Sequence, residues 1–142
     1  MKKIVWQLFY WFALMCWIGV IFWFSSQPNL QSGLERWQDL VLRKIAHMAE
    51  YFVLTYLVLQ CLPRRIGRVE SALALGFALL VAIFDEYHQR FIPGRHGSPV
   101  DVGIDTAGSV GLLVLAALSN RRKFGYTHQG GGPSGVGGRL KI

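Results

Sequence analysis

The sequence begins with an uncharged run that is long enough to cross a membrane. Residues 4–24 are 21 amino acids without a charge, and Gln7 is the one strongly polar side chain among them. As a helix this run rises about 32 Å, which matches the roughly 30 Å hydrocarbon core of a bilayer. Residues 25–28 offer no small-residue cleavage site, so we expect an uncleaved anchor with Lys2 and Lys3 on its cytoplasmic flank. This excludes a soluble enzyme.

Three further apolar segments follow, at residues 45–62, 71–92 and 100–118. We also expect a separate short interfacial helix at 34–41, because a capping-box spacing precedes it. The chain is 52% hydrophobic and only 16% charged, which argues against disorder and is too apolar for a soluble surface. Because lipid-exposed backbone cannot remain unpaired, we predict an all-α fold, a bundle of four transmembrane helices with their charged positions turned inward.

Lysine and arginine are divided unequally between the two sides of this bundle. With the N-terminus inside, ten of the fifteen lie on the cytoplasmic side and five outside. The positive-inside rule then predicts cytoplasmic termini and external loops at 25–44 and 90–99. The net charge of +7 is mostly this signal, so we expect no nucleic-acid partner. We assign residues 1–123 to the membrane domain and 124–142 to a disordered, glycine-rich cytoplasmic tail.

The acidic residues gather on the opposite, external side. Seven of the eight fall there, and three helices bring five of them to one membrane level: Glu50, Asp85, Glu86, Asp101 and Asp105. A carboxylate at this depth costs a few kcal/mol unless it is paired. The sequence therefore predicts a site at the external ends of the last three helices.

The second helix carries three polar groups at three-residue steps. Lys44, His47 and Glu50 share one face, which combines a cation, an imidazole and a carboxylate. A His-x-x-Glu pair can ligate a metal, and it can equally be a salt bridge that holds the bundle together. The spacing alone favours neither interpretation.

The third helix ends in several polar residues before a break at residues 93–94. Asp85 and Gln89 are four apart and share a face, while Glu86 and Arg90 share the adjacent face and could pair. The Pro-Gly break predicts a loop that folds back over the site and places Arg95 to hold an anion.

The fourth helix opens with two carboxylates four residues apart. Asp101 is explained by the helix dipole, whereas Asp105 lies deeper, where that effect has faded. We expect the glycines at 103, 108 and 111 to allow close helix contact. At the end of the first helix, the hydroxyls of Ser25 and Ser26 can cap the helix or bind a ligand.

Together these motifs resemble the VanZ-like membrane proteins, a family named after a protein associated with low-level resistance to the glycopeptide teicoplanin. The resemblance covers roughly residues 20–112 and rests on residues 24–28, 44–51, 85–89 and 93–95 and on Asp101, Asp105 and Gly108. It implies a small multi-pass protein of the bacterial cytoplasmic membrane with an envelope role. The resemblance does not indicate which reaction, if any, the protein catalyses.

We assign candidate roles to the polar residues at the external ends. The acid, base or hydrogen-bonding candidates are His47, Glu50, Asp85, Glu86, Asp101 and Asp105. The substrate-binding candidates are Ser25, Ser26, Lys44, Gln89 and Arg95. The favoured interpretation is a binding or catalytic site for an envelope lipid or glycan intermediate, with no fixed oligomeric state implied. The alternatives are an accessory protein whose cluster is structural and an ion pathway, which the apolar inner half of the helices disfavours.

The acidic cluster must also be neutralised. An oxygen-rich set could hold Mg²⁺ or Mn²⁺, but Lys44 and Arg95 lie at the same level and would repel a cation. We therefore favour basic partners and assign no metal ligands, keep a metal as the less favoured alternative, and expect no cofactor. We expect Arg95 and Lys44 to pair with Asp101 or Asp105 and with Glu50 or Asp85.

Overall fold

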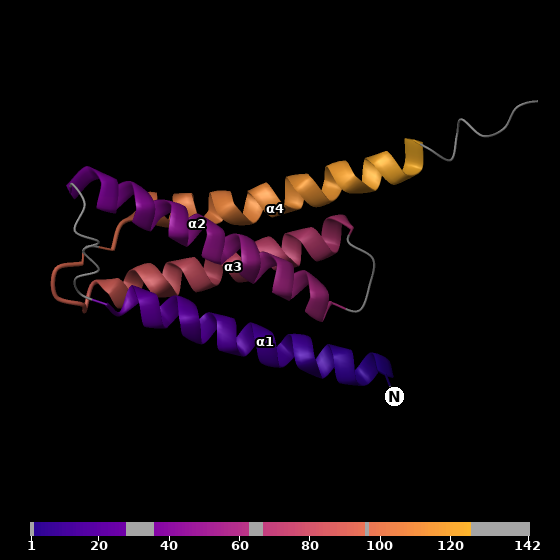
Figure 1. Ribbon diagram of the computed structural model, residues 1–142, viewed down its shortest axis with the longest axis horizontal. Helices are drawn as coiled ribbons and strands as arrows, with labels where there is room; N and C mark the ends of the chain where they lie inside the picture. Colours follow the sequence, from indigo (N-terminus) through magenta and orange to yellow (C-terminus); the bar gives the residue numbers. More distant parts are fainter. Residues whose placement is uncertain (1, 28–35, 63–66, 96, 126–142) are drawn as a thin grey trace, which may run out of the picture.

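The computed structural model describes residues 2–27, 36–62, 67–95 and 97–125, and all regular structure in these ranges is helical. The helices are α1 (Lys2–Ser25), α2 (Arg36–Cys61), α3 (Arg68–Gln89) and α4 (Pro99–Gly125). Each apolar segment of the sequence forms one helix. The predicted all-α class is confirmed (Figure 1).

The four helices lie side by side along the long axis of the molecule (Figure 1). The last turns of α1 and α3 and the first turns of α2 and α4 gather at the end opposite the N-terminus. Among the described residues, α2 and α3 contact each other and both outer helices, whereas α1 and α4 do not touch. We call this end, where all four helices meet, the polar end.

A stripe of small side chains lets α3 lie against its neighbours. Ala74, Ala78 and Ala82 recur every four residues and are at most 1% exposed. Small residues permit close helix approach, which is a main source of helix association in lipid. The same face continues into Asp85 and Gln89, both buried, so the packing of α3 itself carries a carboxylate into the bundle.

The contact between α2 and α4 depends on one glycine. A Cβ atom on Gly108 would lie 2.1 Å from the carbonyl oxygen of Met48, so nothing larger than hydrogen fits there. Gly103 and Gly111 have no atom within 4 Å of such a Cβ in the described structure. The expectation of close helix contact is confirmed for Gly108 and is wrong for the other two.

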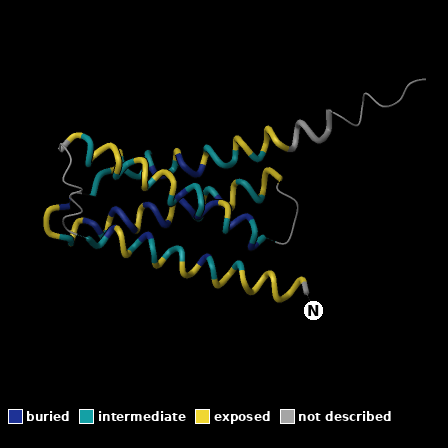
Figure 2. Tube along the Cα trace, in the orientation of Figure 1, coloured by how far each residue is buried: buried dark blue, intermediate teal, exposed yellow. Residues whose placement is uncertain are grey.

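The outer surface of the bundle is apolar. Large hydrophobic side chains are strongly exposed on every helix, among them Phe12 at 69%, Trp37 at 64%, Phe84 at 63% and Leu115 at 55%, and Figure 2 shows exposed positions along the outward faces. Soluble monomers rarely expose apolar area on this scale. Two segments, Lys3–Ser25 and Pro99–Ser119, are long and apolar enough to span a membrane.

Three helix boundaries differ from the prediction. The expected interfacial helix is wrong as a separate element, because α2 runs without a break from Arg36. No proline or glycine interrupts residues 36–61, so nothing in the sequence stops that helix. α3 ends at Gln89 instead of continuing to residue 92, and α4 extends to Gly125. The remainder of the expected tail, residues 126–142, lies outside the described residues.

Candidate functional site

The polar end brings together buried and half-buried polar side chains from all four helices. α1 supplies Ser25, α2 supplies His47, Glu50 and Tyr51, α3 supplies Asp85, Glu86 and Gln89, and α4 supplies Asp105. Ser25 and Asp85 are fully buried and Asp105 is 1% exposed. The helices thus bury Asp85, Glu86 and Asp105 inside the bundle, whereas Glu50 is half-buried and the Asp101 side chain is about one-third exposed.

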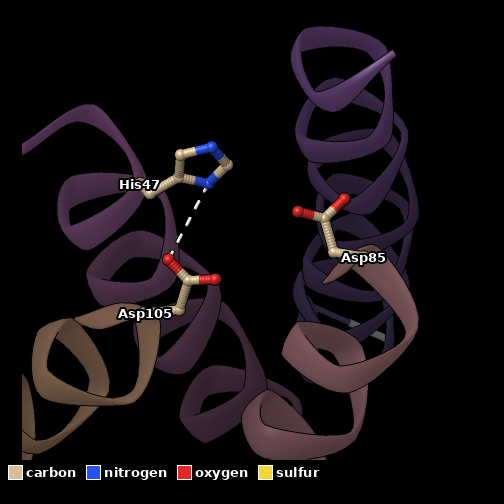
Figure 3. A group of neighbouring side chains, drawn as sticks. All are labelled: His47, Asp85 and Asp105. Atoms are coloured by element: carbon tan, nitrogen blue, oxygen red, sulfur yellow. Dashed lines mark ion pairs between the residues drawn. The ribbon is translucent and has the colours of Figure 1, made fainter. Parts of the chain in front are cut away.

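Three of these side chains converge on one point. His47, Asp85 and Asp105 each offer one donor atom, and these atoms lie within 4.8 Å of one another. Figure 3 shows the imidazole and the two carboxylates approaching from three different helices. The Nδ1 atom of His47 is 3.8 Å from Oδ1 of Asp105 and 3.5 Å from Oε2 of Glu50. We call His47, Glu50, Asp85 and Asp105 the carboxylate–imidazole cluster.

Several atoms in and around this cluster have no hydrogen-bond partner in the described structure. Buried polar groups normally have at least one. The atoms concerned are Ser25 Oγ, His47 Nδ1, Glu50 Oε2, Tyr51 OH, Asp85 Oδ1, His88 Nδ1 and Asp105 Oδ2. Burying this many polar atoms without hydrogen bonds would cost considerable folding free energy if the cluster served only to hold the helices together. The cluster therefore has unused capacity to bind something.

The two basic side chains expected to neutralise the cluster point elsewhere. Lys44 Nζ lies 2.5 Å from Oδ1 of Asp101, and both side chains are about one-third exposed, 34% and 33%. Asp101 is one of the four carboxylates expected to pair with the basic side chains, and the ion pair lies at the edge of the polar end.

Arg95 makes a different contact from the one we expected. Its guanidinium donates to the carbonyl oxygens of Phe24, at 3.0 Å, and Gln27, at 3.1 and 3.2 Å. The last carbonyls of a helix lack intrahelical partners, so a buried guanidinium at the end of α1 satisfies them. Burial, and then the nearby Arg43, lower the pKa of Arg95 below its ordinary value. The predicted carboxylate partner of Arg95 is wrong for the described residues.

The end of α3 is tied to the loop that follows it. Gln89 Nε2 donates to Asp85 Oδ2 at 3.0 Å, which confirms their shared face. Glu86 Oε2 accepts the backbone N–H of Ser98 at 2.8 Å, in place of the expected pairing with Arg90. A Cβ atom on Gly97 would lie 2.1 Å from the carbonyl oxygen of Glu86. The loop therefore packs directly on the end of α3.

Two serines at the end of α1 and one tyrosine of α2 differ in their surroundings. Ser25 is buried at the cluster, whereas Ser26 directly follows α1 and its hydroxyl donates to the carbonyl of Phe22 in the last turn of that helix at 2.6 Å. Tyr51 was not among the predicted site residues, although it is fully buried with an unpartnered hydroxyl. Its position one helical turn after His47 is the sequence signal that could have included it.

A cleft of about 310 Å³ opens between α3 and α4 beside the cluster. Ile83 and Val102 lie at the end of the cleft farther from the polar end, and Tyr87, Glu86 and Arg90 lie toward the polar end. Its walls thus change from apolar to charged along the axis of the bundle. This gradient matches an amphiphilic ligand.

Fold and site together define a small helical membrane protein with a buried carboxylate–imidazole cluster at one end of its bundle. Residues 9–120 match the family model described as VanZ/LLP1, and the chain belongs to this VanZ-like family. It is also 37% identical over 111 residues to an uncharacterized membrane protein, YwnJ, of Bacillus subtilis (strain 168), covering 73% of this chain and 74% of that protein. No solved structure matches the chain. The family resemblance of the sequence motifs is confirmed.

Proposed function

We propose that this protein binds an anionic envelope lipid, or a lipid-linked glycan intermediate, in the outer leaflet of the bacterial cytoplasmic membrane. In this proposal all four helices span the membrane, both termini are cytoplasmic and the polar end faces outward. The ten-to-five division of basic residues supports this orientation. Exposed apolar side chains on α2 and α3 as well as on α1 and α4 support four spans.

The cleft between α3 and α4 is the observation that carries the proposal. Ile83 and Val102, at the end of the cleft farther from the polar end, suit a hydrocarbon chain, and Arg90 toward the polar end suits a phosphate. Arginine binds phosphate through two parallel hydrogen bonds, which a lysine cannot match. Arg90 is exposed, whereas the hydrogen bonds of Arg95 go to the end of α1. We therefore assign the anion to Arg90.

Among the acid–base candidates, Glu86 is the one that lines the cleft. General acid–base catalysis needs a carboxylate within hydrogen-bond reach of the substrate. Any proton transfer to a ligand in this cleft would therefore pass through Glu86. His47, Glu50, Asp85 and Asp105 do not line the cleft, and Asp101 holds Lys44.

The proposal connects to glycopeptides through the envelope intermediate and not through the antibiotic itself. A protein that holds a lipid-linked precursor in the outer leaflet changes how much of that precursor is accessible at the cell surface. We expect the intact chain to raise tolerance to teicoplanin and an Arg90→Ala variant to raise it less.

A second candidate function is an accessory protein whose polar end only holds the helices together. The ion pair of Lys44 with Asp101 joins α2 to α4, and Arg95 joins the loop before α4 to the end of α1. Those two contacts favour a structural role for the residues that make them. They do not involve the cleft.

The experiment is a lipid-binding titration on the full-length chain in detergent, followed by native mass spectrometry. The probe is a polyprenyl monophosphate. The control lipid is phosphatidylcholine, whose net charge is zero. Arg90→Ala should weaken polyprenyl phosphate binding about tenfold, equivalent to about 1.4 kcal/mol. Lys44→Ala is the matched control, because it removes one positive charge at the same end but outside the cleft, and it should change binding less than about twofold.

Two results would overturn the proposal. One is equal binding of the two lipids by the wild-type chain. The other is an equal effect of Arg90→Ala and Lys44→Ala, which would show that general charge and not the cleft attracts the lipid.

A further inference from the structure

We propose that His47, Asp85 and Asp105 bind one divalent transition-metal cation, Mn²⁺ or Zn²⁺, inside the bundle at the polar end. The proposal goes beyond lipid binding, because the site it uses lies behind the cleft and needs no lipid. It also replaces the expectation from the sequence that basic side chains neutralise the carboxylates.

His47, Asp85 and Asp105 are arranged so that each could supply one ligand atom to the same metal ion. They come from α2, α3 and α4, and their donor atoms lie within 4.8 Å of one another (Figure 3). Metal bonds to imidazole nitrogen and carboxylate oxygen are about 2.0–2.2 Å long, so donors around one tetrahedral or octahedral ion lie about 2.8–3.6 Å apart. The donor atoms must therefore approach one another by about 1 Å to complete the site. Side-chain torsions supply such movements without any shift of a helix.

A second and independent observation points to a ligand. His47 Nδ1, Asp85 Oδ1 and Asp105 Oδ2 are buried without a hydrogen-bond partner in the described structure. Asp85 is fully buried and Asp105 is 1% exposed, so water does not solvate them from outside. Each residue of the set thus aims at least one unused donor atom into the bundle. One cation would satisfy all three.

The neighbouring residues position these ligands. Gln89 Nε2 donates to Asp85 Oδ2 at 3.0 Å, and the Ser25 hydroxyl lies beside the same carboxylate, so both side chains orient it. Hydrogen bonds of this kind around a metal orient its ligands and tune their basicity. Glu50 Oε2, 3.5 Å from His47 Nδ1 and itself unpartnered, is placed to become a fourth ligand.

Two nearby basic side chains, Lys44 and Arg95, could repel a cation, but each binds other groups. Lys44 pairs with Asp101 at the edge of the polar end, and the Arg95 guanidinium donates to carbonyls of residues 24 and 27. Neither occupies the space between His47, Asp85 and Asp105. Three carboxylates around one imidazole leave a net negative charge that a divalent cation would balance.

The donor set selects the class of metal. Mg²⁺ and Ca²⁺ prefer oxygen ligands alone, whereas imidazole nitrogen suits first-row transition metals. One imidazole with two or three carboxylates is a mixed set, which Mn²⁺ and Zn²⁺ accept. Neither thiol takes part, because Cys16 lies on the outer face of α1 and Cys61 at the far end of α2.

The test is metal analysis of the full-length chain, purified in detergent without chelators from cells grown with both metals. Elemental analysis should find about one transition-metal ion per chain. Asp85→Asn and Asp105→Asn should each lower this at least tenfold. Asp101→Asn is the matched control, because it removes a carboxylate on α4 at the same end that is already paired with Lys44, and it should keep the ion.

A second measurement guards against variants that fail to fold. The wild-type chain is stripped of metal, and its thermal unfolding is followed with added Mn²⁺ or Zn²⁺ alone. A ligand that binds only the folded state raises the midpoint of unfolding, so the wild type should respond and folded Asp85→Asn should not.

The proposal is overturned if the wild type carries no transition metal and its midpoint responds to neither cation. It is also overturned if Asp101→Asn loses as much metal as Asp85→Asn. No lipid enters either measurement, and no metal is needed for the lipid titration. The failure of one proposal is therefore distinguishable from the failure of the other.

Discussion

Replacing Gly108 with alanine should separate α4 from α2. The added Cβ would lie 2.1 Å from the carbonyl oxygen of Met48, against an ordinary contact of about 3.5 Å, so the helices must move apart by roughly 1.4 Å. Overpacking of this kind costs about 1–3 kcal/mol, and the clash here is with backbone, which cannot turn away. The opening falls next to His47 and one turn from Asp105, so it also widens the 3.8 Å separation between these two side chains.

The control for this prediction is on the same helix. A Cβ on Gly111 meets nothing within 4 Å, and alanine is about 1 kcal/mol better than glycine inside a helix. Gly111→Ala should therefore be as stable as the wild type or more stable, while Gly108→Ala should be less stable. The assay is thermal or denaturant unfolding of the purified chain in one detergent, followed by circular dichroism. If Gly108→Ala is as stable as Gly111→Ala, the assigned contact between α2 and α4 is incorrect.

Four further predictions concern other parts of the molecule. A double-mutant cycle on Lys44 and Asp101 should give a coupling energy of about 1 kcal/mol or less, because both side chains are one-third exposed. Trp17→Phe should cost about 1 kcal/mol of unfolding free energy, since its indole N–H donates to a carbonyl of α2 at 3.0 Å. Ala78→Leu should lower the unfolding free energy more than Trp17→Phe does, because residue 78 on α3 is 1% exposed and a larger side chain would overpack the helix contact. A cysteine placed at Ser98 in a chain without other cysteines should react with a membrane-impermeant maleimide in intact cells, and labelling only after permeabilisation would reverse the proposed orientation.

The sequence was sufficient for the parts of the fold that depend on hydrophobic pattern. An uncharged run such as residues 4–24 can form little other than a membrane-length helix, and α1 occupies Lys2–Ser25. The position of Asp85 was predictable for a related reason. A carboxylate after fourteen apolar residues must turn inward, and it is fully buried.

The partners of individual polar atoms were not predictable in the same way. A carboxylate was a reasonable partner for Arg95, but its guanidinium donates to backbone carbonyls at the end of α1. Backbone acceptors have no signature in the side-chain sequence. The role of each glycine was not predictable either. Gly103, Gly108 and Gly111 lie on the same helix, and only the close approach of α2 to α4 distinguishes Gly108 from the other two.

The central claim is that the carboxylate–imidazole cluster is a binding site and not a support for the fold. The most direct measurement is the unfolding free energy of metal-free Asp105→Asn relative to the metal-free wild type. If the cluster is a site, removing one of several crowded and unpartnered carboxylates relieves repulsion, and the variant should be as stable as the wild type or more stable. If Asp105 is instead half of a structural ion pair with His47, the variant should lose about 3–5 kcal/mol, and that result would contradict the account.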